Sequence, residues 1–193
     1  MNRAMLAGIV VLGLAAAPMV AAQETTRPQK APQRADNKSV MGDQAWVTKV
    51  AQGGMAEVEL GKLATEKAAS DEVKKFGQRM VDDHSKANDE LKTLAQNKKI
   101  TLPTDIDAKH KAERDRFSKL SGAAFDRAYM QAMVAGHREV ENLFRMESTS
   151  GKDPDVKAWA AKTLPTVEEH LKMAQQTTTA VGTSGTKTKG SKK

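Results

Sequence analysis

Cysteine is absent from this chain of 193 residues, and aromatic residues are scarce, with four Phe, two Trp and one Tyr. Without cysteine the chain cannot form disulfides, thiol nucleophiles, zinc–thiolate sites or iron–sulfur clusters. The sequence also lacks a phosphate-binding loop and any nucleophile–base motif. No class of enzyme is therefore indicated, and the question becomes what the remaining residues can bind or build.

Positive charge is in excess, but it is not spread evenly along the chain. The formal net charge is +7, from 31 Lys and Arg against 24 Asp and Glu. Residues 43–172 hold 22 of each sign, so the whole excess lies in the two flanking segments. A neutral central region offers no electrostatic footprint for nucleic acid, and we expect no nucleic-acid partner.

The first 22 residues have the pattern of a secretory signal peptide. Arg3 precedes an apolar run from Met5 to Val20, and small residues follow up to Ala22. An uncleaved membrane anchor is the alternative, but the run is interrupted by Pro18 and is barely long enough to cross ~30 Å of hydrocarbon. No cysteine follows for lipid attachment, and there is no second long apolar run. We predict an exported, periplasmic protein without an integral membrane segment after cleavage.

Two segments contain hardly any bulky apolar residue. Residues 23–42 mix Pro, Gln, Thr and scattered charges, and residues 177–193 are mostly Thr, Gly, Ser and Lys. Such segments bury too little surface to offset the entropy of ordering. We predict a disordered linker over 23–42 and a disordered basic tail over 177–193, whose lysines allow weak contact with an anionic envelope surface.

Between these segments, residues 43–176 predict a single all-α domain. Apolar residues recur at spacings of three and four, and no β-branched run alternates as a strand would. The residues that mark helix ends are Ser70-Asp71 and Asn97-Lys98-Lys99 for the second long helix, Ser121-Gly122 for the third and Asp153-Pro154 for the fourth. A capping box of Thr104 and Asp107 predicts a short helix to about Lys119 within the connection between the second and third. Four long helices with one long crossover match a ferritin-like four-helix bundle.

Three of the four histidines lie within apolar stripes. His84, His137 and His170 belong to three different helices, and the first helix carries Glu57 in the corresponding place. Residues equidistant from the turn of an antiparallel hairpin lie side by side. Glu57 pairs in this way with His84, and His137 with His170. If the two hairpins dock as in a ferritin-like bundle, the four side chains converge in the interior.

Two interpretations of this convergence are open. One is a transition-metal site with Glu57, His84, His137 and His170 as ligands, because imidazole and carboxylate suit zinc, copper, iron or manganese. Asp83 and Tyr129 would then stand behind the ligands. The other is a metal-free polar network that Tyr129 or Asp83 completes, because a buried polar group without a partner costs several kcal/mol.

Oxygen-activating diiron chemistry is not expected. The ferritin-like diiron proteins use Glu-x-x-His motifs, and none is present here. His110 has Asp107 at the corresponding spacing, but this pair lies in the connection and is interpreted as a surface pair.

Several runs resemble a bacterial exported family known as domain of unknown function 4142 (DUF4142). They are Gly54–Ala64, Arg79–His84, Ser121–Met130 and Thr163–Thr166 ahead of His170. The resemblance covers about Asp43 to Gln176 and implies a ferritin-like bundle behind a signal peptide, with no settled activity. It places the family's helix-one Glu at Glu57 and its three histidines at His84, His137 and His170. The family often has an acidic residue before the third-helix histidine, where this chain has Gly136.

The leading hypothesis is an exported ferritin-like protein of undefined activity that binds a transition metal inside the bundle. The alternative is a non-catalytic envelope structural or stress-related protein with a metal-free polar core.

Overall fold

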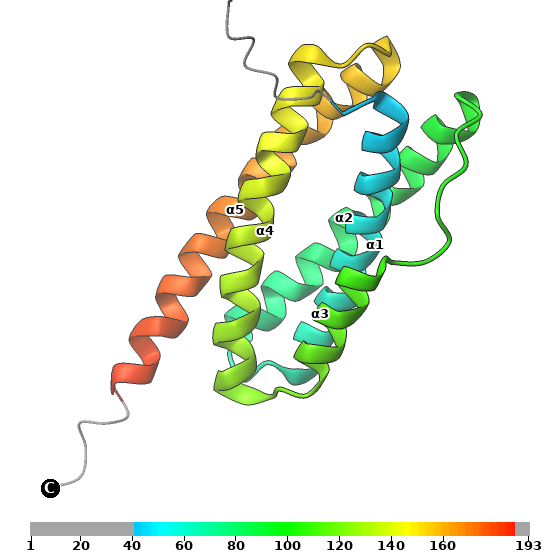
Figure 1. Cartoon of the computed structure of the whole chain (residues 1–193). Helices are drawn as coiled ribbons and strands as arrows, with labels where there is room; N and C mark the ends of the chain where they lie inside the picture. The colour runs from blue at the N-terminus through cyan, green and yellow to red at the C-terminus, as the bar shows by residue number, and fades with distance from the viewer. Residues whose placement is uncertain (1–40, 188–193) are drawn as a thin grey trace, which may run out of the picture. The chain divides into compact units, whose positions relative to one another are not determined.

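The computed structural model of the chain describes residues 41–187. The expected signal peptide over 1–22 and the expected linker as far as residue 40 lie outside the described residues. Within the described range there are five helices and no strand. They are α1 (Asp43–Lys67), α2 (Asp71–Asn97), α3 (Ala108–Ser118), α4 (Gly122–Ser150) and α5 (Pro154–Lys187), as Figure 1 shows. The predicted all-α class is confirmed, and none of these helices has a stretch long and apolar enough to cross a membrane.

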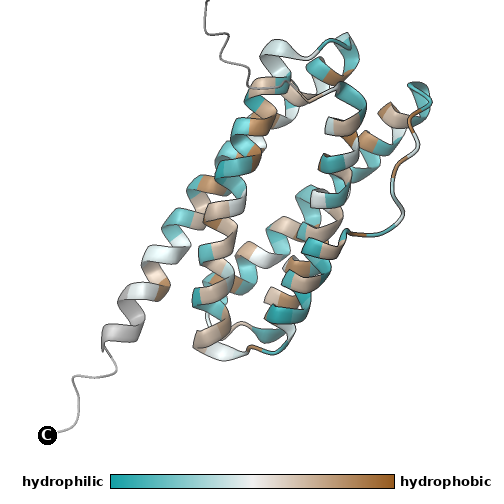
Figure 2. Cartoon of the chain, in the orientation of Figure 1, coloured by the Kyte–Doolittle hydropathy of each residue, from teal (hydrophilic) through white to brown (hydrophobic). Residues whose placement is uncertain are grey.

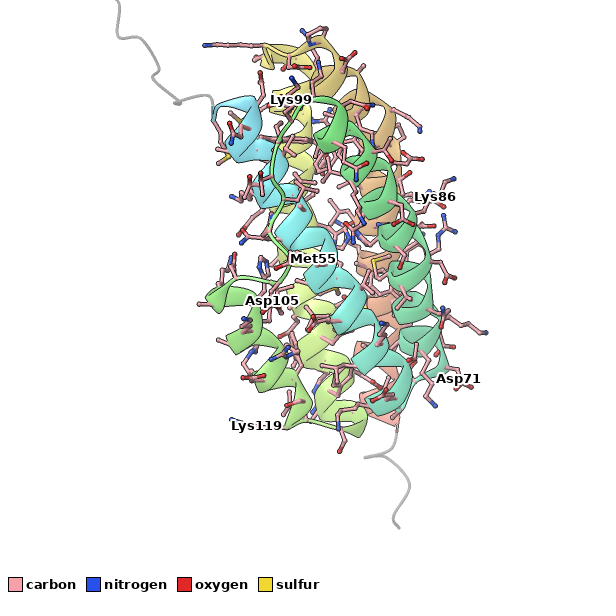
Figure 3. The ribbon with its side chains drawn as sticks, turned by 90° about the vertical axis from the view of Figure 1, so that its right-hand side faces the viewer. Met55, Asp71, Lys86, Lys99, Asp105 and Lys119 are labelled. Atoms are coloured by element: carbon pink, nitrogen blue, oxygen red, sulfur yellow. The ribbon has the colours of Figure 1, made fainter. Side chains whose placement is uncertain are left out.

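The four long helices pack as two hairpins. α1 packs along α2, and α4 packs along α5, while α2 contacts α5 and α1 contacts α4 (Figure 1). The short helix α3 lies in the connection between α2 and α4 and packs mainly against α1. Figure 3 shows this connection running beside α1, with Asp105 on the same side as Met55.

Two expected helix boundaries, the end of α2 and the start of α5, are confirmed. α2 ends at Asn97, and Lys99 follows in the left-handed region with a φ of 56°. α5 begins at Pro154, and Oδ1 of Asp153 accepts hydrogen bonds from the backbone N–H groups of Asp155 and Val156. These ends agree with the sequence because capping depends on a few neighbouring residues.

Two apolar clusters fill the interior, and the histidines come between them along each helix. Hydrophobic and hydrophilic residues alternate along the helices in Figure 2, as expected for helices with one buried face. The first cluster includes Leu60, Phe76, Met80, Phe117, Phe125, Tyr129 and Met133. The second includes Trp46, Val47, Leu91, Phe144, Trp159 and Val167.

An aspartate from each hairpin caps the turn of the other. Asp126 on α4 is 4% exposed and accepts hydrogen bonds from the backbone N–H groups of Ala69 and Ser70, at 3.0 and 2.9 Å. At the opposite turn, Asp43 on α1 accepts from the backbone N–H groups of Lys152 and Asp153, at 3.0 and 2.8 Å. These bonds tie the two hairpins together at both turns.

Glycine permits the close approach of α1 and α2. A Cβ atom at Gly77 would lie 2.6 Å from Cβ of Ala64 and 2.8 Å from the carbonyl oxygen of Gly61. No real Cβ atom tolerates such distances, so this crossing requires glycine.

The short helix begins later than the sequence predicted. α3 starts at Ala108, and its N-cap is Asp107, whose Oδ1 accepts from the backbone N–H of His110 at 2.9 Å. The expected capping box at Thr104 does not form, because Asp107 supplies the cap itself. The end of α3 at Ser118 agrees with the expected end near Lys119.

The last helix is longer than expected. α5 continues to Lys187, past the predicted domain end at Gln176 and into the segment expected to be disordered from Thr177. Val181 packs against the first apolar cluster, and Oγ1 of Thr178 donates to the carbonyl oxygen of Ala174 at 2.7 Å. These contacts extend the helix where composition alone predicted disorder.

Candidate metal centre

Three imidazole rings converge inside the bundle, one from each of α2, α4 and α5. One ligand atom each from His84, His137 and His170 lies within 4.8 Å of the other two. The ring centroids are 5.3 Å apart for His84 and His170, 5.5 Å for His137 and His170, and 6.1 Å for His84 and His137. We refer to these three residues as the histidine cluster.

Each ring of the cluster has a buried nitrogen without a hydrogen-bond partner. Nδ1 of His137 lies 2.9 Å from the carbonyl oxygen of Met133, so this nitrogen donates and Nε2 is left with a lone pair. Nε2 of His170 lies 2.7 Å from Oδ2 of Asp83, which leaves Nδ1. Nε2 of His137, Nδ1 of His170 and Nε2 of His84 are all buried and unpartnered.

The surroundings of His84 and His170 favour the neutral form of these two imidazoles. Burial, together with the charges of His170 and His137, lowers the pKa of His84 to about 3. Burial also lowers the pKa of His170, although the hydrogen bond to Asp83 opposes this shift. Neutral imidazole is the form that coordinates metal ions.

Asp83 connects the cluster to the surface of the bundle. Burial alone would raise its pKa, but hydrogen bonds from Arg79 and His170 hold the pKa of Asp83 below its usual value. Nη2 of Arg79 in turn lies 3.5 Å from Oε2 of Glu169 on α5. An ionised carboxylate behind a histidine fixes the orientation of the ring and increases its basicity.

Glu57 is beside the cluster but does not join its ligand atoms. Its Oε2 is buried without a hydrogen-bond partner, and burial raises the pKa of Glu57. The hydroxyl of Tyr129 is also buried and unpartnered, and burial and the charge of Glu57 raise the pKa of Tyr129. The structure thus brings together three of the four ligands considered from the sequence and places the fourth nearby.

A cavity of about 430 Å³ opens onto this region and is lined by all five helices. Glu57, His84 and His170 face it. A Cβ atom added at Gly53 on α1 or at Gly136 on α4 would meet no atom within 4 Å, so both glycines border open space. The cavity therefore borders two of the three histidines of the cluster.

Two features of the site were not evident from the sequence. The resemblance left His137 without an acidic partner because Gly136 precedes it. The carbonyl oxygen of Met133, one turn earlier, accepts the hydrogen bond from His137 instead.

The second feature is the place of His110, which was interpreted as part of a surface pair. Its Nδ1 does lie 2.9 Å from Oδ1 of Asp107, but the side chain is only 22% exposed and lines the cavity. The sequence carries no signal for the placement of His110 beside the cavity, because this placement depends on how the connection between α2 and α4 docks.

Comparisons with known proteins agree with this architecture. No protein among the curated ones matches the chain. A solved structure described as "CopM in the Cu(II)-bound form" is similar with a TM-score of 0.61 and 18% sequence identity, over 72% of this chain and 97% of that chain. At this identity the likeness shows a shared fold. The family model "Domain of unknown function (DUF4142)" matches residues 27–177, most of the chain, so the resemblance seen in the sequence is confirmed and the protein belongs to this family.

Proposed function

We propose that the protein binds one transition-metal ion through His84, His137 and His170. Two observations carry this proposal: each ring has a buried nitrogen without a hydrogen-bond partner, and each ring offers a ligand atom within 4.8 Å of those of the other two. A buried polar atom without a partner is costly and rare. One metal ion satisfies all three lone pairs at once.

The dimensions of the cluster suit such an ion after a small adjustment. Metal–nitrogen bonds of ~2.0–2.1 Å place tetrahedral nitrogen ligands ~3.4 Å apart. The nitrogens of the cluster lie within 4.8 Å, so small rotations of the rings bring them to coordination distance. Glu57 is the candidate fourth ligand, with Asp83 and Tyr129 behind the ligands.

Copper is the first ion to test. Imidazole nitrogens suit copper, zinc, iron and nickel, so the donor set by itself does not choose among them. The solved structure that shares the fold is a Cu(II)-bound form. The proposal is one of metal binding and assigns no reaction to the protein.

The surroundings of the site are part of the same proposal. We propose that the four long helices form a ferritin-like bundle with α3 in the crossover, and that residues 1–22 direct export to the periplasm. Residues 23–42 would then act as a linker ahead of the bundle. In the alternative hypothesis, a metal-free polar core, the cluster would act only in packing; the three unpartnered nitrogens favour a metal ion instead.

The test is a titration of the untagged full-length chain with copper(II), monitored by calorimetry and by electron paramagnetic resonance. We expect one equivalent to bind with nitrogen hyperfine coupling. His84→Ala and His170→Ala should each weaken binding by more than about 100-fold, since even residues behind a ligand contribute about 10–100-fold. Gln131→Ala, an exposed change on α4, is the control. Unchanged affinity in both histidine variants, or no binding by the wild-type chain, would refute the proposal.

A further inference from the structure

A second group of potential ligands faces the cavity from α3. Asp107, His110 and Glu113 recur at a spacing of three residues, so they share one side of this helix. All three line the cavity that His84 and His170 also line. Their side chains are 37%, 22% and 28% exposed, respectively, so they also reach solvent. The cavity therefore joins partly exposed groups on α3 to the buried histidine cluster.

Glu57 is electrostatically coupled to both groups. Its carboxyl interacts with the charge of His137 on α4 and with the charges of Glu113 and His110 on α3. Its Oε2 is buried and has no hydrogen-bond partner, although such a group is costly to bury. A cation travelling between α3 and the cluster would supply the missing partner.

The groups on α3 are suited to attract and hold a cation. The backbone N–H of His110 donates to Asp107 and, although burial opposes the shift, holds the pKa of Asp107 below its usual value, so this carboxylate is ionised. Nδ1 of His110 lies 2.9 Å from Oδ1 of Asp107, but it is buried and has no hydrogen-bond partner, so its lone pair is open to a cation. Imidazole and carboxylate are both ligands of divalent transition metals, and negative charge at the mouth of a cleft raises the local concentration of cations.

We propose that Glu113 and His110 form an outer site through which a divalent transition-metal cation reaches Glu57 and the histidine cluster. This inference rests on the proposed function. Among the residues that the structure describes, the three histidines are the only group of three or more His, Asp or Glu side chains whose ligand atoms lie close enough together to hold a metal ion, so the outer site is loose. Loose coordination is what passage requires, because an ion held tightly on α3 would not move on.

The test is the rate of copper(II) binding to the full-length chain, measured by stopped-flow quenching of tryptophan fluorescence. Trp159 lines the cavity and serves as the probe. Copper(II) sulfate is supplied in excess glycine so that free ion is buffered. Glu113→Gln and His110→Ala should each lower the association rate by about tenfold, the lower end of what electrostatic focusing contributes. The dissociation rate should fall by the same factor, which leaves the equilibrium affinity unchanged.

Asp115→Asn is the matched control, because Asp115 is on the same helix, 61% exposed, and does not line the cavity. It should bind copper(II) at the wild-type rate. Wild-type rates in both Glu113→Gln and His110→Ala would overturn the outer site and leave the proposed function intact. A loss of equilibrium affinity without a slower association would make Glu113 and His110 ligands of the resident ion and would overturn the proposal. Equal slowing of association by Asp115→Asn would show that only general surface charge matters, and it would overturn the proposal as well. If the wild-type chain binds no metal at all, both proposals fail together.

Discussion

Nε2 of His170 lies 2.7 Å from Oδ2 of Asp83, and this contact joins α5 to α2 beside the histidine cluster. It occupies Nε2 and leaves the other ring nitrogen, Nδ1, buried without a partner. In the proposed metal site, this contact therefore holds the ring of His170 and leaves Nδ1 for the ion.

Replacing Asp83 should weaken metal binding without removing a ligand. In Asp83→Asn the amide is neutral, so it does not pair with the charge of Arg79 and does not increase the basicity of His170. We expect copper(II) affinity to fall by about 10–100-fold, the usual effect of a lost partner behind a histidine ligand. Asp82→Asn is the control, because Asp82 is exposed and bonds only to Gln78 in the described part of the chain. Equal affinities for the two variants in a calorimetric titration would contradict the orienting role.

Glu147 should make the stability of the bundle depend on pH. This residue is 2% exposed, and burial and Asp43 raise its pKa to about 7. The usual pKa of a glutamate is 4.5, so between pH 4.5 and about 7 the folded state retains the proton while the unfolded state loses it. Stability is therefore expected to fall as pH rises from about 4.5 to about 7, and to stay lower above that range.

The test of this pH dependence is urea unfolding at about pH 5 and about pH 8. Glu147→Gln should be more stable than the wild type at the higher pH by on the order of 2 kcal/mol, because the amide is never charged. The variant should also lose most of the pH dependence. The exposed Glu139→Gln should leave it unchanged. A wild-type curve that is flat over this range would show that Glu147 does not titrate there.

Asp126 should be important for stability because it caps the α1–α2 turn from the other hairpin. Asp126→Ala leaves the N–H groups of Ala69 and Ser70 without their acceptor, at a cost of about 3 kcal/mol in the free energy of unfolding. Asp71→Ala is the control, because Asp71 lies near the same turn and its side chain is 81% exposed. This change should cost less than about 1 kcal/mol in the free energy of unfolding. Similar unfolding midpoints for the two variants would count against the cap.

Two glycine-to-alanine changes on neighbouring helices should have opposite effects. Gly77→Ala places a methyl group 2.6 Å from Cβ of Ala64, so α1 and α2 must separate, and we expect a loss of about 1–3 kcal/mol. Gly53→Ala meets no atom within 4 Å inside α1 and should gain about 0.5–1 kcal/mol from helix propensity. Thermal unfolding measures both, and a loss of stability in Gly53→Ala would show that the space beside α1 is not open.

Much of the fold could be predicted because the relevant interactions are local. The helical class, the end of α2 at Asn97 and the start of α5 at Pro154 follow from spacing and capping over a few residues. The levels of His84, His137 and His170 within their hairpins also followed from the sequence, whereas their meeting depended on how the two hairpins dock. A position's distance from a helical turn sets its level in a hairpin, and its place in an apolar stripe sets its direction.

Other features depended on contacts between segments far apart in the chain. α5 continues to Lys187 through a segment whose composition predicts disorder, and Val181 in this segment packs against the core. The sequence by itself determined the helical class and the level of each histidine within its hairpin, because spacing and distance from a turn are local properties. Only the tertiary structure decided that the two hairpins dock so that His84, His137 and His170 meet and that His110 faces the cavity, because these relationships depend on contacts between helices far apart in the chain.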